Sequence, residues 1–458
     1  MKLSVTRGVA LYVGALLGPG LLVLPGLAAA AAGPASILAW IGLLILSGLL
    51  AVVFAALGVA RPSDGGAATY VRAGLGPRAG RAASWCFLAG IITGAPVVCH
   101  MGAGYLAALL GAGREATALA GAGLLVVVLA VTMCGVRAST TVQLALIGVL
   151  VVVVVVAVAG AVPSSAARNW QPFAPHGWPA VGSAAALLML SFVGWEAIAP
   201  LTARFLDPRR QLPKVIGIAF AVTTVVYLSL AAVTVAALGS RAGTEVPLAA
   251  LLSLSFGSAG SAVAAGAAIA LTVGTTNAYF TGGATLARTL TAPGRRRWAD
   301  RLVIPPWLLT VMLAAELVAT WLLGTGTVPV SAMVTVPSAF FLAVYLGCTV
   351  SGWRTLTGAP RAVAAVATVA VAAVLLLTRY ALIPALLVTV ATAMWPAGRT
   401  GMVTPRPGAA GRGSRRQCEP GRSGDRTARV RSRRAGVPAG RPESPGAAPA
   451  GGDACRPA

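Results

Sequence analysis

The sequence predicts an all-α polytopic membrane protein with twelve transmembrane helices, built as a five-plus-five inverted repeat with broken first and sixth helices. Three observations predict it: an apolar composition, regularly spaced apolar runs, and two interruptions at matching places. Of the 458 residues, 57% are hydrophobic and 10% are charged. A soluble domain carries about 25% charged residues, so the composition excludes that class.

The apolar runs define the predicted spans. A helix that crosses the hydrocarbon core needs about 20 apolar residues, and long runs cross it at a tilt. We therefore expect one transporter domain over residues 1–396. Its twelve runs lie near residues 8–32, 35–60, 80–110, 116–136, 140–162, 183–203, 214–239, 256–290, 303–324, 327–350, 362–379 and 381–396.

Basic residues predict the orientation, because cytoplasmic loops are enriched in Lys and Arg. With the N-terminus inside, 18 Lys and Arg residues before the tail lie on the cytoplasmic side and 4 on the other. This predicts a multi-pass protein of the cell membrane with both termini in the cytoplasm. The net charge of +24 is then a topology signal, and no nucleic-acid partner is expected.

The composition changes at about residue 397. Residues 397–458 are rich in Gly, Pro, Ser and Arg and have almost no large apolar side chains. Such a segment cannot bury a core, so we predict a disordered basic cytoplasmic tail. Its arginines either contact anionic lipid or remain solvated without a function.

The first apolar run contains the sequence GALLGPG at residues 14–20. Pro19 removes a backbone donor, and the glycines beside it hold a helix weakly. Non-helical backbone at mid-depth is tolerated only where it is buried in protein or lines a cavity. The stretch predicts a discontinuous helix that faces a binding site; a proline-kinked packing helix is the alternative.

The sixth run contains a second interruption, LSFVGWEAIAP at residues 190–200, with Gly194 beside Glu196. Interruptions at corresponding places in two halves indicate a transporter site. A helix N-terminus offers amides to a carboxylate, whereas a helix C-terminus offers carbonyls to an ammonium group. The two breaks together therefore predict a site for a zwitterion, an α-amino acid.

The sequence resembles the amino acid–polyamine–organocation permeases over roughly residues 5–396. Within this family it looks closest to the bacterial amino-acid efflux branch, which exports methionine and branched-chain residues. Four stretches in order carry the resemblance: GALLGPG at 14–20, PSDGGAATYVRAGLG at 62–76, FVGWE at 192–196 and DPRRQLP at 207–213.

The resemblance implies a two-bundle fold with alternating access and a substrate site made of main-chain groups. Amides near Gly18 and Gly20 would hold the carboxylate, and carbonyls of both breaks would hold the ammonium. Pro19 departs from the Ser or Thr that the family often has, so one carboxylate contact is missing. The expected substrate-binding residues are Leu16, Leu17, Gly18, Pro19, Gly20, Phe192, Val193, Gly194 and Trp195.

Three side chains are candidates for proton coupling, because membrane-embedded ionisable groups are costly and usually functional. Glu196 either accepts a proton, pairs with the substrate ammonium, or holds the unwound segment by hydrogen bonds. Glu316 is either a proton site or a helix-packing contact. His100 either relays protons or packs, since free imidazole titrates near neutral pH. Phe192 and Trp195 either gate the site or pack.

Small polar groups in the eighth run, Thr275 and Thr276, are candidates for an ion site. In sodium-coupled relatives, hydroxyls at this place and carbonyls of the first helix hold the ion. In some other relatives a lysine of the fifth helix occupies that space. The fifth run here, residues 140–162, has Gln143 and no lysine, so this comparison leaves the coupling open. A proton, or no coupling ion, is the expectation.

The predicted function is secondary active amino-acid transport, with export of small apolar amino acids (Met, Leu, Ile, Val) by proton coupling or exchange. An importer or exchanger of other specificity is the alternative within transport; a channel or a membrane enzyme is the alternative of another class. The loops contain no paired carboxylates, His cluster or metal-ligand spacing, so no catalysis, metal or cofactor is expected. The oligomeric state is left open.

Overall fold

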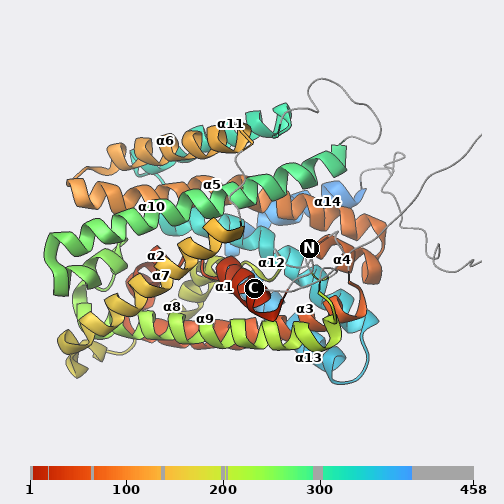
Figure 1. Cartoon of the computed structure of the whole chain (residues 1–458), viewed down its shortest axis with the longest axis horizontal. Helices are drawn as coiled ribbons and strands as arrows, with labels where there is room; N and C mark the ends of the chain where they lie inside the picture. Colours follow the sequence, from red (N-terminus) through yellow and green to blue (C-terminus); the bar gives the residue numbers. More distant parts are fainter. Residues whose placement is uncertain are drawn as a thin grey trace, which may run out of the picture. The chain divides into compact units, whose positions relative to one another are not determined.

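The computed structural model describes residues 4–18, 20–62, 66–135, 140–196, 202, 205–291 and 303–394. All regular structure in these residues is helical (Figure 1). Nine helical stretches in the described part are long and apolar enough to cross a membrane, and three shorter apolar helices cover Val5–Leu16, Pro179–Phe192 and Arg379–Met394. The predicted class, an all-helical membrane protein, is confirmed.

Each predicted apolar run contains at least one helix. The helices, named in Figure 1, are α1 Val5–Leu16, α2 Gly20–Ala32, α3 Ser36–Ala60, α4 Ala67–Leu75, α5 Pro77–Leu110, α6 Arg114–Met133, α7 Thr140–Ala161, α8 Pro179–Leu188, α9 Pro208–Leu238, α10 Pro247–Thr291, α11 Pro306–Thr325, α12 Val330–Thr355, α13 Ala359–Leu377 and α14 Leu382–Met394. Short 3₁₀ turns join several of them.

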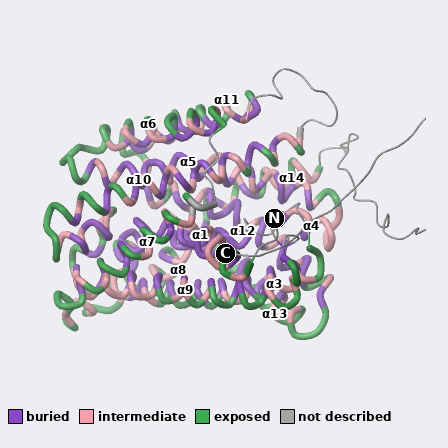
Figure 2. Tube along the Cα trace, viewed as in Figure 1, coloured by how far each residue is buried: buried purple, intermediate pink, exposed green. Residues whose placement is uncertain are grey.

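Helices α10 and α12 each pack along α5. Helices α6 and α11 pair outside α5, while α3 pairs with α9 (Figure 1). Burial follows this arrangement: α12 is buried along most of its length, whereas α6 and α13 expose one side (Figure 2). The exposed sides carry large apolar residues such as Leu119 and Val369, as expected for surfaces that contact lipid.

Two short helices were missing from the sequence prediction. The second half of the motif at residues 62–76 forms α4, which was not among the predicted runs. Helix α10 is longer than the predicted run because residues 247–256 form a helical segment of their own before a kink at Gly257. Apolar length identifies spans but does not detect such short helices between them.

The first predicted interruption lies between two helices, and at the second the helical backbone ends at Phe192. Helix α1 ends at Leu16 and α2 begins at Gly20, whereas Pro19 lies outside the described residues. Helix α8 ends at Leu188, and the 3₁₀ turn η4 (Met189–Phe192) follows it. Residues 197–201, which follow the second interruption, and the tail from residue 395 also lie outside the described part.

Candidate functional site

The first break has a partly satisfied backbone. The amide of Leu17 donates to the Val13 carbonyl at 2.7 Å, and the amide of Gly18 donates to the Leu16 carbonyl at 2.9 Å. The next helix begins with the Leu21 amide, which bonds the Gly18 carbonyl at 3.1 Å. Since the first amides of a helix have no intrahelical partner, the start of α2 offers N–H groups to a ligand. Gly18 itself has already used its amide.

The two breaks touch backbone to backbone. Gly194 adopts φ +155°, and a β-carbon added there would lie 2.5 Å from the carbonyl oxygen of Ala15. The obstacle is main chain, so it cannot rotate away. Only glycine lets the sixth segment approach the end of α1 this closely.

Two buried tyrosines tie the breaks to the rest of the fold. The Tyr227 hydroxyl, on α9, lies 2.5 Å from the Leu16 carbonyl and 2.6 Å from the Ser191 carbonyl, so it bridges the first and sixth segments. The Tyr345 hydroxyl, on α12, lies 3.3 Å from the Phe192 carbonyl. Helix-end carbonyls that lack intrahelical partners are thus met by side chains.

Glu196 sits inside this network and is 2% exposed. Its Oε2 atom accepts the Gly194 amide at 3.0 Å and the Tyr345 hydroxyl. Its Oε1 atom has no hydrogen-bond partner among the described residues. These contacts are the ones a structural acid would make to hold an unwound segment, which was one of the three roles expected for Glu196.

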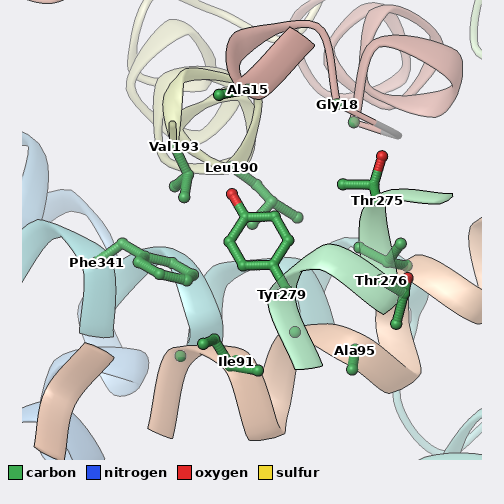
Figure 3. Close-up of a pocket in the computed structure, with 14 residues that line it drawn as sticks. Ala15, Gly18, Ile91, Ala95, Leu190, Val193, Thr275, Thr276, Tyr279 and Phe341 are labelled. Atoms are coloured by element: carbon green, nitrogen blue, oxygen red, sulfur yellow. The ribbon is translucent and has the colours of Figure 1, made fainter. Parts of the chain in front are cut away.

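A pocket opens between the breaks and three helices (Figure 3). It holds about 550 Å³ of empty space, a volume that includes open solvent at its mouth. The first break, the sixth segment, α5, α10 and α12 all contribute to its wall. The lining residues are Ala15, Gly18, Gly20, Gly90, Ile91, Gly94, Ala95, Val98, Leu190, Val193, Thr275, Thr276, Tyr279 and Phe341.

None of the lining residues is charged; three hydroxyls, those of Thr275, Thr276 and Tyr279, are the polar side-chain groups. In Figure 3, the Thr275 hydroxyl points toward Gly18, and Tyr279 stands between α5 and the sixth segment. The charges of a bound ligand would therefore have to be met by main-chain groups and helix ends. Such groups suit a small molecule that carries both a carboxylate and an ammonium.

The structure brings some of the expected site residues together. Gly18, Gly20, Val193, Thr275 and Thr276 line one pocket although the chain separates them by up to 250 residues or so. Gly194 is not in the lining but contacts the backbone of Ala15, which is. An ion held by the two threonines stays a prediction, as does the role of Pro19, which lies outside the described residues.

Other expected site residues contribute no side chain to the pocket lining. Leu16 and Leu17 are at most 2% exposed and pack into the core. The Phe192 ring packs against Trp40 and Tyr227 in tilted contacts. The Trp195 indole donates to Ser47 on α3 at 3.0 Å. The two aromatic rings thus make packing contacts in this state of the protein.

His100 and Glu316 are also outside the pocket lining. On α5 the pocket face comprises residues 90, 91, 94, 95 and 98; His100 follows Val98 by two residues, about 200° around the helix. Its backbone lies against Gly121 of α6. Glu316 lies on α11 and is 6% exposed.

The pocket walls from α5 and α12 were not expected. Gly90, Gly94 and Val98 recur at intervals of four residues, which places them on one face of α5. That spacing of small residues is visible in the sequence and was a usable signal. Phe341 and Tyr279 had no distinguishing pattern, because many of their neighbours in the sequence are also apolar.

Comparison with known proteins agrees with this geometry. The chain is 29% identical to the L-methionine/branched-chain amino acid exporter YjeH of Escherichia coli over 80% of this chain and 88% of that protein. It is 33% identical to the uncharacterized amino acid permease YecA of Bacillus subtilis over 50% of this chain and 54% of that protein, and 27% identical to the branched-chain amino acid permease BcaP of the same organism over 53% and 56%. The model of a family described as amino acid permease matches residues 3–404. With two helix breaks meeting at a charge-free pocket, and with this match over most of its length, the chain belongs to the amino acid permease family and is a membrane transporter, not an enzyme.

Proposed function

We propose that the protein is a secondary active transporter of apolar amino acids that binds its substrate between the two helix breaks. The observation that carries this proposal is the pocket, which has helix ends at one side and no charged side chain in its lining. The start of α2 faces the substrate carboxylate. The ammonium faces main-chain carbonyls at the ends of α1 and η4. Among these, the carbonyls of Leu17 and Val193 accept no hydrogen bond from a described residue.

The pocket wall suits a substrate of the Met, Leu, Ile and Val class. Ile91, Val98, Leu190 and Phe341 present apolar surface, while Gly90, Gly94 and Ala95 leave room beside them. A hydrophobic pocket discriminates weakly between side chains that differ by one methylene group. We therefore expect a range of apolar substrates, in which charged amino acids are rejected because no side chain in the wall neutralises them.

An inverted repeat of five plus five helices with α13 and α14 outside it, twelve spans in total, is part of the proposal. In each proposed half, a broken helix is followed by a long helix, a short helix and another long helix. The short helices are α4 in the first half and residues 247–256 in the second. Each ends at a glycine with positive φ, Gly76 at +89° and Gly257 at +56°, which supports a common plan.

Export by proton coupling or exchange is our proposal for the direction. It is supported by the similarity to YjeH, whose name describes an exporter. Import is the alternative; BcaP is named as a branched-chain amino acid permease, and that name states no direction. We also propose the cell membrane as the location, with both termini in the cytoplasm as the basic residues indicate.

Transport by purified protein in liposomes tests the proposal. Liposomes loaded with unlabelled methionine or leucine should take up the labelled amino acid faster than empty ones, and uptake should saturate. A panel of twenty amino acids should show competition by apolar members and none by lysine or glutamate. Non-saturating flux without acceleration by internal substrate would indicate a channel and refute the proposal.

A further inference from the structure

Glu316 occupies an unusual position on α11. The side chains of Leu308, Met312 and Ala319 share its buried face, whereas Leu317 on the other face is 72% exposed. Glu316 is the one charged residue in the sequence of this helix, and it stands where an apolar residue would complete the packing. A carboxyl group that faces inward from a membrane helix is expensive and usually functional.

The Glu316 carboxyl is only half satisfied. The Thr320 hydroxyl, one turn later, donates to Oε1 at 3.2 Å. Oε2 is buried and has no hydrogen-bond partner among the described residues, and no described cation forms an ion pair with the group. An ionised carboxylate is costly to bury without a counter-charge, whereas a protonated one carries no charge and can donate a hydrogen bond.

The groups around Glu316 do not replace a counter-ion. Helices α5 and α6 pack against α11. From α5, the Cys99 thiol lies within electrostatic range of the carboxyl, and His100 is its neighbour in the chain. From α6, the charged side chains are Arg114 and Glu115 in the first turn; Arg114 contacts the far end of α11, ten residues or roughly 15 Å away.

Helix α10, beyond α5, contributes two ionisable side chains. Tyr279 lines the pocket, and Arg288 bonds the Val303 carbonyl before α11 begins, at the other end of α11 from Arg114. The charged groups of the neighbouring helices are thus gathered at the two ends of α11, and the region around Glu316 is otherwise apolar.

A line of polar side chains connects this carboxyl with the pocket. Thr276 lines the pocket, and its buried hydroxyl has no hydrogen-bond partner among the described residues. Cys99 lies one turn after Ala95, which lines the pocket, and is buried in the same cluster as Leu308 and Met312 on the inward face of α11. Leu125, Val128 and other apolar side chains fill the rest of this region.

We propose that Glu316 is the proton-binding site of the transporter and exchanges its proton with the substrate pocket past Thr276 and Cys99. Here a proton from water binds Oε2 to form the neutral acid, and the same O–H bond breaks when the proton leaves. Water in an open pocket stabilises the charged form. Closure of the pocket removes that water and favours the neutral form, which couples proton binding to the transport cycle. The inference rests on the proposed amino-acid transport.

The test compares Glu316→Gln with Glu115→Gln, an exposed acid at the start of α6, in liposomes with labelled methionine. Two assays are run: exchange at equal pH on both sides, which needs no net proton movement, and accumulation driven by an imposed pH gradient. We expect Glu316→Gln to keep exchange within about twofold and to lose at least tenfold of the gradient-driven accumulation. Glu115→Gln should match wild type in both assays.

Full gradient-driven accumulation by Glu316→Gln would overturn the inference and leave the proposed function intact. The same holds if the wild-type protein exchanges methionine but no pH gradient makes it accumulate methionine. Absence of exchange by wild type would overturn both.

If Glu316→Gln does not fold, wild-type protein is treated with dicyclohexylcarbodiimide, which modifies protonated carboxyl groups in apolar surroundings. We expect the reagent to label the peptide that contains Glu316. Gradient-driven accumulation should be lost, and exchange should be retained. Labelling of Glu196 alone, or of neither acid, would overturn the inference.

Discussion

Replacement of Gly18 by leucine tests the main-chain site most directly. A β-carbon added at Gly18 meets no atom within 4 Å, and the residue lines the pocket. The variant should therefore fold without a clash, and its new side chain should occupy the space of the substrate. Overpacking costs about 1–3 kcal/mol for added methylenes, so at about 1.4 kcal/mol per tenfold even Gly18→Ala should weaken binding by about 5- to 140-fold. Gly18→Leu should abolish saturable binding.

Gly42→Leu is the matched control. Gly42 lies on α3, is exposed, and also has nothing within 4 Å of an added β-carbon. Both variants should purify as single species with thermal unfolding midpoints close to wild type. Labelled methionine binding and exchange should be lost in Gly18→Leu and kept in Gly42→Leu. Unchanged affinity of Gly18→Leu would refute a site at the first break.

Four other substitutions test single contacts. Gly194→Ala places a β-carbon 2.5 Å from a main-chain oxygen and should cost about 1–3 kcal/mol; a wild-type thermal midpoint would contradict the backbone contact. Tyr227→Phe leaves two helix-end carbonyls without their donor and should cost about 1–3 kcal/mol, measured by the same midpoint. Glu196→Gln should keep the pH profile of transport and lower the midpoint, because its carboxylate is bonded to protein groups; a flattened profile would restore it as a proton site. Phe341→Ala widens the pocket and should shift competition toward larger apolar amino acids, whereas an unchanged panel would place the substrate side chain elsewhere.

The positions of the helices were largely predictable. The observed helix of the second run, Ser36–Ala60, begins within one residue of the predicted 35–60. The agreement has a physical cause: a backbone inside the hydrocarbon core must satisfy its polar groups internally, so an apolar run of that length becomes a helix. The first break was readable for the same reason, since Pro and Gly interrupt that pattern.

The side-chain walls of the site were much less predictable. In a soluble helix the apolar stripe shows which face is buried. A membrane helix is apolar on the lipid side as well, so the pattern does not distinguish the inward face from the outward one. Phe341 on α12 and Trp321 on α11 look alike in sequence, yet Phe341 lines the pocket and Trp321 is 61% exposed.

The sequence by itself determined the class of protein, the approximate ends of its helices, the place of the first break and the family resemblance. These follow from local composition, because the bilayer constrains each segment separately. Only the tertiary structure decided that Gly194 meets the end of α1, that Trp195 packs on α3, and that Glu316 lies on the buried face of α11. Such contacts join residues on different helices, and which faces meet is set by the packing of all of them together.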